Sequence, residues 1–148
     1  MPLPPLNDEG ELPPGVHAAS IGEVLARFGT GGPKRRVVAL RVERIHQLVM
    51  ATGQVHRFLI FGSFATSKAA PNDVDVFLLM KDTFNLSGIS GEARIIFDHA
   101  GAEAHFGASV FWMRRLSAIP NEAEVVAHWQ GRRNGGRRGI VEIVSEPS

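Results

Sequence analysis

Along most of the chain, apolar and polar residues follow either a helical or a strand period. Apolar residues recur every three or four positions over residues 34–51, with charged residues between them. The apolar positions that share one side of this segment are Val38, Val42, Ile45 and Val49. This spacing predicts an amphipathic helix, and Gly53 is suited to cap its C-terminal end.

Three further helical segments are expected. Ser20 and Glu23 have the spacing of a capping box, in which the serine satisfies an amide at the helix start and the glutamate reaches back, so a short helix should follow Ser20 and end before Gly29. The other two segments are residues 91–105, interrupted near Gly101, and residues 121–130, which follow Pro120.

Four short runs rich in β-branched and aromatic residues predict strands. They span residues 55–61, 74–80, 108–113 and 140–144. Helices therefore alternate with strands, and the chain shows no internal repeat and no interdomain linker. The expected class is α/β, or α+β, around a small sheet.

The first 15 residues differ in composition from the rest. Five of the nine prolines of the chain lie in residues 1–15. Since proline lacks an amide donor and fixes φ, we expect an extended arm here, followed by one domain over residues 16–148.

The composition is that of one globular domain and excludes several classes of protein. With 148 residues, 44% of them hydrophobic and 21% charged, the chain can bury a core. The absence of cysteine excludes disulfides, thiolate zinc sites and a cysteine nucleophile, and the net charge of +1 gives no general signal of polyanion binding. No apolar run is long enough to span a membrane and the N-terminus lacks a secretory pattern, so we expect a cytoplasmic protein without a membrane partner.

The chemically informative segment contains two acids near the start of an expected strand. Asp73 and Asp75 are two positions apart, so their side chains should project on the same side. Two adjacent carboxylates repel unless a cation lies between them. Mg²⁺, or Mn²⁺, takes such oxygen ligands and completes its shell with water and substrate phosphates. The alternative is a simple turn at residues 71–73, with Asp75 exposed to solvent.

Gly62 and Ser63 directly follow another expected strand and favour anion binding. Glycine allows a ligand close to the backbone, amides at the start of a helical turn attract phosphate, and the Ser63 hydroxyl adds a donor. Lys68 is a candidate for balancing triphosphate charge, and an ordinary exposed loop lysine is the alternative. A phosphate site beside a metal-binding pair is typical of metal-dependent phosphoryl or nucleotidyl transfer.

The segment FGSFATSKAAPNDVDVFLL resembles the signature of the polymerase-beta nucleotidyltransferase superfamily. Together with LPPGVHAASIGEVLARFG, FGASVFW and WQGRRNGGRRGIVEIV, it looks like a family of small bacterial nucleotidyltransferase-like proteins without an assigned role. The resemblance covers nearly the whole chain. It implies a minimal nucleotidyltransferase core with a mixed sheet and packed helices, in which Ser63 contacts nucleotide phosphates and Asp73 and Asp75 hold magnesium.

The chain departs from that resemblance in one respect. Active members of the superfamily usually carry a third carboxylate on a neighbouring strand, and the matching run here, residues 108–113, contains no acid. Three acids elsewhere in the chain are candidates for this third carboxylate, namely Asp98, Glu103 and Glu142.

Two functions follow from the resemblance. The first is a metal-dependent nucleotidyltransferase that moves a nucleoside monophosphate from a nucleoside triphosphate to a hydroxyl of a protein, an RNA or a small molecule. The second is a catalytically degenerate fold that senses nucleotide or binds a partner protein, as in toxin–antitoxin pairs, and the missing third acid favours it. A weaker third is RNA binding by arginines that flank a glycine turn, with a solvated hairpin as the alternative. These arginines are Arg132, Arg133, Arg137 and Arg138.

Overall fold

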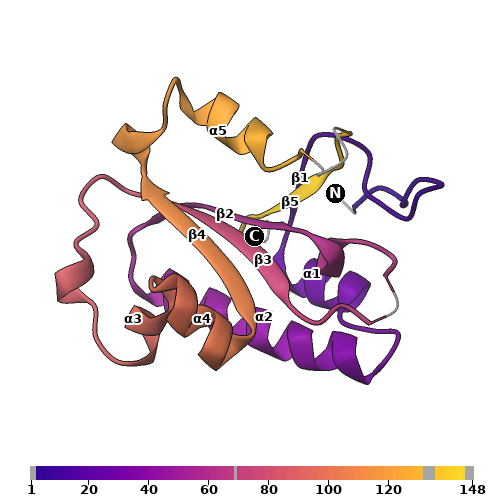
Figure 1. The fold of residues 1–148 in the computed structure, drawn as a ribbon, viewed down its shortest axis with the longest axis horizontal. Coiled ribbons are helices and arrows are strands. Elements are labelled where there is room, and N and C mark those ends of the chain that lie inside the picture. The colour runs from indigo at the N-terminus through magenta and orange to yellow at the C-terminus, as the bar shows by residue number, and fades with distance from the viewer. Residues whose placement is uncertain (1–2, 69, 132–135, 146–148) are drawn as a thin grey trace.

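One mixed five-stranded sheet forms the centre of the computed structural model, which describes residues 3–68, 70–131 and 136–145 (Figure 1). The strands are β1 (Val16–Ala19), β2 (Val55–Phe61), β3 (Val74–Met80), β4 (Ala108–Arg114) and β5 (Ile140–Ile143). Their order in the sheet is β1-β5-β2-β3-β4. β2 is antiparallel to both of its neighbours, whereas β3 pairs with β4 and β1 pairs with β5 in parallel. The expected α/β class is confirmed.

The helices are distributed unequally between the two faces of the sheet (Figure 1). Four helices cover one face: α1 (Ile21–Phe28), α2 (Pro33–Ala51), α3 (Glu92–Ile96) and α4 (His99–Phe106). The short helix α5 (Glu122–His128) crosses the other face. Short 3-10 helices occur at Ser63–Ala65, Leu86–Gly88 and Arg115–Ser117.

Strand alternation divides the core between these two faces. Val76 and Leu78 of β3 pack in the larger core with the buried sides of α1 to α4, whereas Phe77 and Leu79 pack in a smaller core beneath α5. Asp75 has the same parity as Phe77, so it lies on the α5 face. The smaller core leaves part of this face open for a site.

Two expectations about the elements are corrected by the structure. β1 was not expected, because it is short, contains one β-branched residue and pairs with β5 from the other end of the chain. The helical segment at residues 91–105 breaks at residues 97–98 and not at Gly101. Asp98 caps α4 by accepting a hydrogen bond from the amide of Gly101 at 3.1 Å.

The proline-rich arm packs against the domain. Leu3 and Leu12 are buried, and the amide of Leu3 donates to the carboxylate of Glu23. One half of the expected capping box therefore forms, since Ser20 accepts from the Glu23 amide at 3.1 Å. The other half, in which the Glu23 carboxylate would reach back to the start of the helix, is replaced by the hydrogen bond from the Leu3 amide of the arm.

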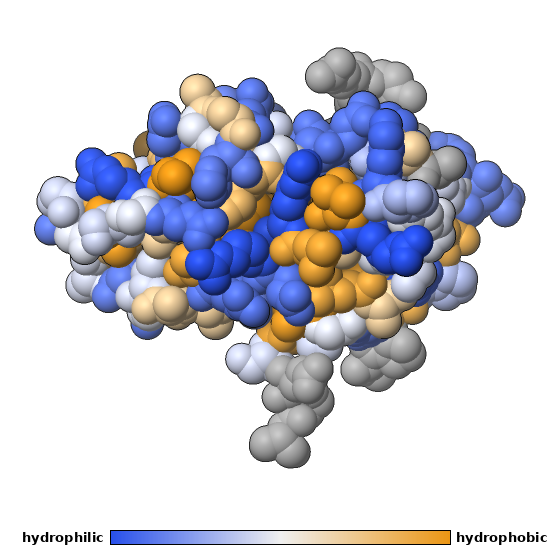
Figure 2. Space-filling model, turned by 90° about the horizontal axis from the view of Figure 1, so that it is seen from below, coloured by the Kyte–Doolittle hydropathy of each residue, from blue (hydrophilic) through white to orange (hydrophobic). Residues whose placement is uncertain are grey.

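Seen from the side of α1 to α4, the surface carries hydrophobic residues among charged ones (Figure 2). The exposed apolar side chains of α2 include Val37, Leu40 and Met50. In the part of the chain that the structure describes, no helix is both long and apolar enough to cross a membrane.

Candidate nucleotide-binding groove

The turn after β2 brings a glycine and a carboxylate into direct contact. Gly62 has φ of +80°, which side-chain-bearing residues rarely adopt, and its ψ is −166°. Phe61 is paired with Asp75 across β2 and β3, and a Cβ placed on Gly62 would lie 1.8 Å from Oδ2 of Asp75. Glycine is therefore required here both by the backbone angle and by the neighbouring carboxylate.

This contact lies in a groove of about 1060 Å³ on the α5 face of the sheet. Four of the residues expected to form the site line it together, namely Gly62, Ser63, Lys68 and Asp75. The remaining lining residues are Phe61, His99, Ser109, Phe111, His128, Trp129, Gly131 and Arg138. The groove thus combines an acid, basic side chains, hydroxyls and aromatic rings.

Asp73 does not lie in the groove with Asp75, the acid that it was expected to accompany. It is exposed, it precedes the first residue of β3, and it does not line the groove. The strand that was expected to present both acids begins one residue after Asp73. Asp75 is therefore the acid that the sheet positions in the groove.

A buried arginine organises the loop that carries Ser63 and Lys68. Arg35 is 6% exposed, and its guanidinium donates to four backbone carbonyls. The acceptors are the carbonyls of Phe28 (3.1 Å), Phe64 (3.0 Å), Thr66 (2.6 Å) and Lys68. Burial lowers the pKa of Arg35, yet a guanidinium remains charged at neutral pH. Its charge is satisfied by carbonyl dipoles, which fix the path of residues 64–68.

The N-terminal arm supports the same loop from outside. The amide of Ser67 donates to the carbonyl of Gly10 at 2.8 Å, and Glu11 and Thr66 form an isolated antiparallel bridge. The loop between β2 and β3 is thus held from α2 on one side and from the arm on the other.

The wall opposite this loop comes from β4 and α4. Ser109 is paired with Asp75 in the parallel register of β3 and β4, so a hydroxyl stands where a third strand carboxylate was sought. Glu103 of α4 accepts a hydrogen bond from the Ser109 hydroxyl at 3.4 Å, and its carboxylate lies 3.2 Å from Nε2 of His99. Glu103 therefore reaches the edge of the groove indirectly, through Ser109 and His99.

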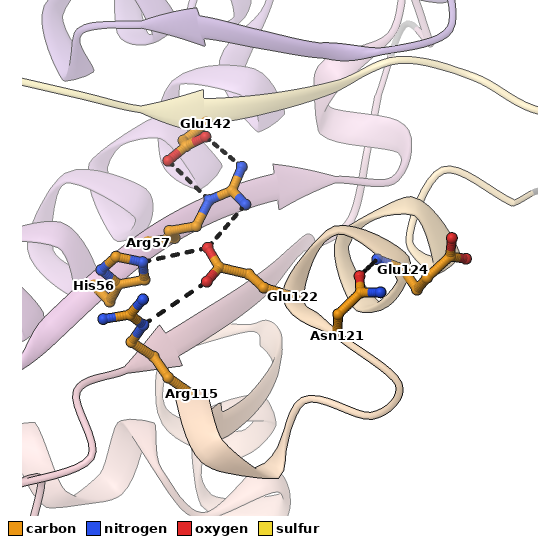
Figure 3. A network of polar contacts seen from close by, with 7 residues as sticks. All are labelled: His56, Arg57, Arg115, Asn121, Glu122, Glu124 and Glu142. Carbon is orange, nitrogen blue, oxygen red and sulfur yellow. Dashed lines mark hydrogen bonds and ion pairs between the residues drawn. The ribbon is translucent and has the colours of Figure 1, made fainter.

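The other two candidate acids are engaged elsewhere. Asp98 caps α4, as described above. Glu142 of β5 binds Arg57 of β2 at 2.7 Å, and this hydrogen bond is the main reason that the pKa of Arg57 is raised (Figure 3). Neither carboxylate lines the groove.

The same ion-pair network attaches α5 to the sheet. Glu122 lies among His56, Arg57 and Arg115 (Figure 3), at 3.2, 3.2 and 3.7 Å respectively. Asn121 caps the helix by accepting from the amide of Glu124 at 3.0 Å. The start of α5 is thereby fixed, and its C-terminal end brings Trp129 against the groove.

Aromatic rings form the floor beneath α5. The ring centroid of Trp129 lies 4.9 Å from that of Phe61, 5.1 Å from that of Phe77 and 4.9 Å from that of Phe111. The indole Nε1 of Trp129 is buried and has no hydrogen-bond partner among the residues described. An unpaired buried donor lowers the free energy of unfolding.

Of the four arginines that were considered for RNA binding, Arg137 and Arg138 lie in the part of the chain that the structure describes. Gly131 and Arg137 form an antiparallel bridge, and Arg138 lines the groove and lies 3.5 Å from Glu11. Arg132 and Arg133 lie outside the described residues.

Comparison with family models shows which protein family the chain belongs to. Residues 4–144 match a model described as Family of unknown function (DUF6932). The chain belongs to this family. No curated protein and no solved structure matches this DUF6932 member.

The carboxylates and histidines of this DUF6932 member form no complete metal site among the residues described. Across residues 3–68, 70–131 and 136–145, no group of three or more His, Cys, Asp and Glu is placed to hold a metal ion. Mg²⁺, however, is often held by one or two carboxylates and completed by water and substrate phosphates. Asp75 beside Gly62 and Ser63 fits an incomplete site of that kind, which a triphosphate would complete.

Two residues of this DUF6932 member that shape the site were not predicted from the sequence: Arg35, which holds the loop from behind, and Ser109, which lines the groove. Arg35 continues the apolar stripe of α2 that includes Val38 and Val42, and a charged residue on a buried stripe was the available signal. Ser109 had no such signal, because its importance depends on its pairing with Asp75 across β3 and β4.

Proposed function

We propose that this protein is a metal-dependent nucleotidyltransferase that acts on a nucleoside triphosphate bound in the groove between the Gly62–Ser63 turn and β4. The observation that carries the proposal is the contact between Gly62 and the Asp75 carboxylate, in a groove that also contains Ser63 and Lys68. An anion-binding turn and a carboxylate that can bind Mg²⁺ are both needed for this chemistry, and they adjoin here.

In the proposed reaction, the oxygen of an acceptor hydroxyl forms a bond to the α-phosphorus. The bond between that phosphorus and the bridging oxygen of pyrophosphate breaks, and pyrophosphate and one proton are released. Ser63 and Lys68 would hold the phosphates of the leaving group, and Asp75, the acid that lines the groove, would hold Mg²⁺ or Mn²⁺. The cation, when bound, neutralises charge on the phosphates. The acceptor is a hydroxyl of a protein, an RNA or a small molecule.

A second candidate function is nucleotide sensing or partner binding without transfer. It is favoured by the pairing of Ser109, and not a carboxylate, with Asp75. In that case the groove would bind a triphosphate and Mg²⁺ with no turnover, and a partner protein would respond to the occupied state. Under this second candidate function, the partner protein would be the other member of a toxin–antitoxin pair.

The two candidates share one compartment and one ligand. We propose a cytoplasmic location for both, because nucleoside triphosphates and magnesium are plentiful there. The experiment must therefore separate binding from transfer.

We expect Asp75→Asn to lower transfer by at least about 100-fold, since a cation at a phosphoryl group contributes several kcal/mol. The measurement uses each of four α-³²P-labelled nucleoside triphosphates with MgCl₂ and a cell lysate as the source of acceptors. Label retained on protein or RNA reports transfer, and Asp73→Asn is measured in parallel.

Glu43→Gln is the matched control. It removes one carboxylate charge from α2, on the opposite side of the sheet, and should leave both transfer and thermal stability unchanged. Magnesium-dependent triphosphate binding that Asp75→Asn abolishes, without transfer in the wild type, would favour the sensing candidate. Equal transfer by wild type and Asp75→Asn would contradict the enzyme.

A further inference from the structure

An aromatic ring is exposed in the groove within two strand positions of Asp75. Phe111 of β4 is 36% exposed and lines the groove together with Ser63 and Asp75. Its strand neighbour Trp112 instead packs on the other face, against Phe84 and Phe97. Phe111 is thus the residue of β4 that presents an aromatic side chain to the groove.

Three aromatic rings pack near the ring of Phe111. Its centroid lies 4.9 Å from that of Trp129, 5.1 Å from His99 and 6.3 Å from Phe61. The planes of Trp129, His99 and Phe61 make angles of 36°, 43° and 35° with the plane of Phe111, so each of these rings is tilted relative to Phe111. A ring supported in this way loses little freedom when another flat group packs against it.

The strand register sets the distance of this ring from the proposed phosphate site. Phe111 is paired with Phe77, and Ser109 is paired with Asp75, on the same face of the sheet. Two strand positions and one strand spacing separate Phe111 from Asp75 along the sheet, or about 8 Å between backbone positions. The sugar of a nucleotide spans a gap of this size between its phosphates and its base.

We propose that Phe111 is the platform on which the base of the bound nucleotide stacks. This inference rests on the proposed function, because it takes the phosphates to lie at Gly62, Ser63 and Lys68. The groove is charged and polar at that end and aromatic at the β4 end, which matches the two ends of a nucleoside triphosphate. Stacking on an aromatic ring tolerates every base, since each base has a π-face.

The test compares ATP with tripolyphosphate, which has the phosphates and no base. Both are titrated in the presence of MgCl₂ into the full chain, and binding is measured by calorimetry. In Phe111→Leu we expect the dissociation constant of ATP to rise by about tenfold or more and that of tripolyphosphate to stay unchanged. Phe111→Tyr should restore ATP binding, because it keeps the ring.

Leu116→Ala is the control, because it removes apolar surface at a residue that is 83% exposed and outside the groove. Thermal unfolding of each variant confirms that the fold is retained. An unchanged ATP affinity in Phe111→Leu, or an equal weakening of ATP and tripolyphosphate, would overturn the platform while leaving the proposed function in place. If wild-type protein binds neither ligand, the proposed function is wrong and the platform is rejected with it.

Discussion

Two properties of residue 62 require a glycine: its positive φ and the close approach of the Asp75 carboxylate. Its backbone angles lie in a region used almost exclusively by glycine, and the carboxylate of Asp75 occupies the space of a β-carbon. The first requirement concerns stability, and the second concerns the position of the acid.

We expect Gly62→Ala to lower the free energy of unfolding by about 1–3 kcal/mol from backbone strain alone, and to displace Asp75 as well. Urea unfolding measures the stability, and magnesium-dependent ATP binding measures the displacement. Gly53→Ala is the matched control, because Gly53 also has positive φ, +66°, but nothing lies within 4 Å of its added Cβ. If both variants lose the same stability and neither alters ATP binding, the contact with Asp75 has no role.

At the same scale, the sequence predicted one site for Asp75, Ser63 and Lys68 from strand parity, turn chemistry and charge, and these residues do line one groove. It also paired Asp73 with Asp75, and the structure leaves Asp73 exposed before the strand. Strand parity predicts a shared face only while the strand continues, and β3 begins at Val74. Their roles in binding metal remain predictions.

At the scale of elements, the loop between β2 and β3 depends on α2. Arg35 connects the end of α1 and the loop through carbonyl oxygens, so α2 positions the loop by hydrogen bonds in addition to apolar packing. Such a loop is ordered before any ligand arrives, which reduces the entropy lost on binding.

We expect Arg35→Met to lower the free energy of unfolding by about 3 kcal/mol or more, because buried carbonyls lose their donors. The loop should also open to trypsin, so cleavage after Lys68 under native conditions is the second measurement. Arg36→Met removes an exposed arginine at the next position and should change stability by less than about 0.5 kcal/mol. Equal behaviour of the two variants would show that the carbonyl contacts are unimportant.

The elements differ in how well the sequence predicted them. β2 and β3 have the expected bounds, because each ends in a run of apolar residues, FLIF in β2 and VFLLM in β3. β1 was missed because it depends on a distant partner strand. The break between α3 and α4 was expected near Gly101 and lies at residues 97–98, because its position depends on the side-chain cap at Asp98. Local periodicity does not report either.

At the scale of the whole molecule, stability depends on pH through a histidine that packs between α2 and the sheet. His46 lies 5.4 Å from the ring of Phe58, and burial lowers its pKa below the ordinary value. In the unfolded chain the imidazole takes up a proton near pH 6.5, whereas the folded state resists protonation.

We therefore expect the urea midpoint of unfolding to fall as the pH decreases from 7 through about 6.5 and to level off below the pKa of folded His46. The unfolded state binds more protons in this window, so acid favours it. The comparison is with His46→Gln, in which every other titrating group is kept, and the difference between the two profiles isolates His46. Parallel profiles would contradict the assignment.

The strong helices and strands, the α/β class and the two motifs that suggested a nucleotide site were all predictable from the order of the amino acids. These features are set by neighbours along the chain, where the hydrophobic period and turn residues act directly. The tertiary structure decided that Asp75 presses on Gly62, that Ser109 lies opposite Asp75, that Arg35 holds the loop and that α5 covers one end of the open face. Those contacts follow from strand order and helix placement, which join segments far apart in the chain and leave no periodic signal in it.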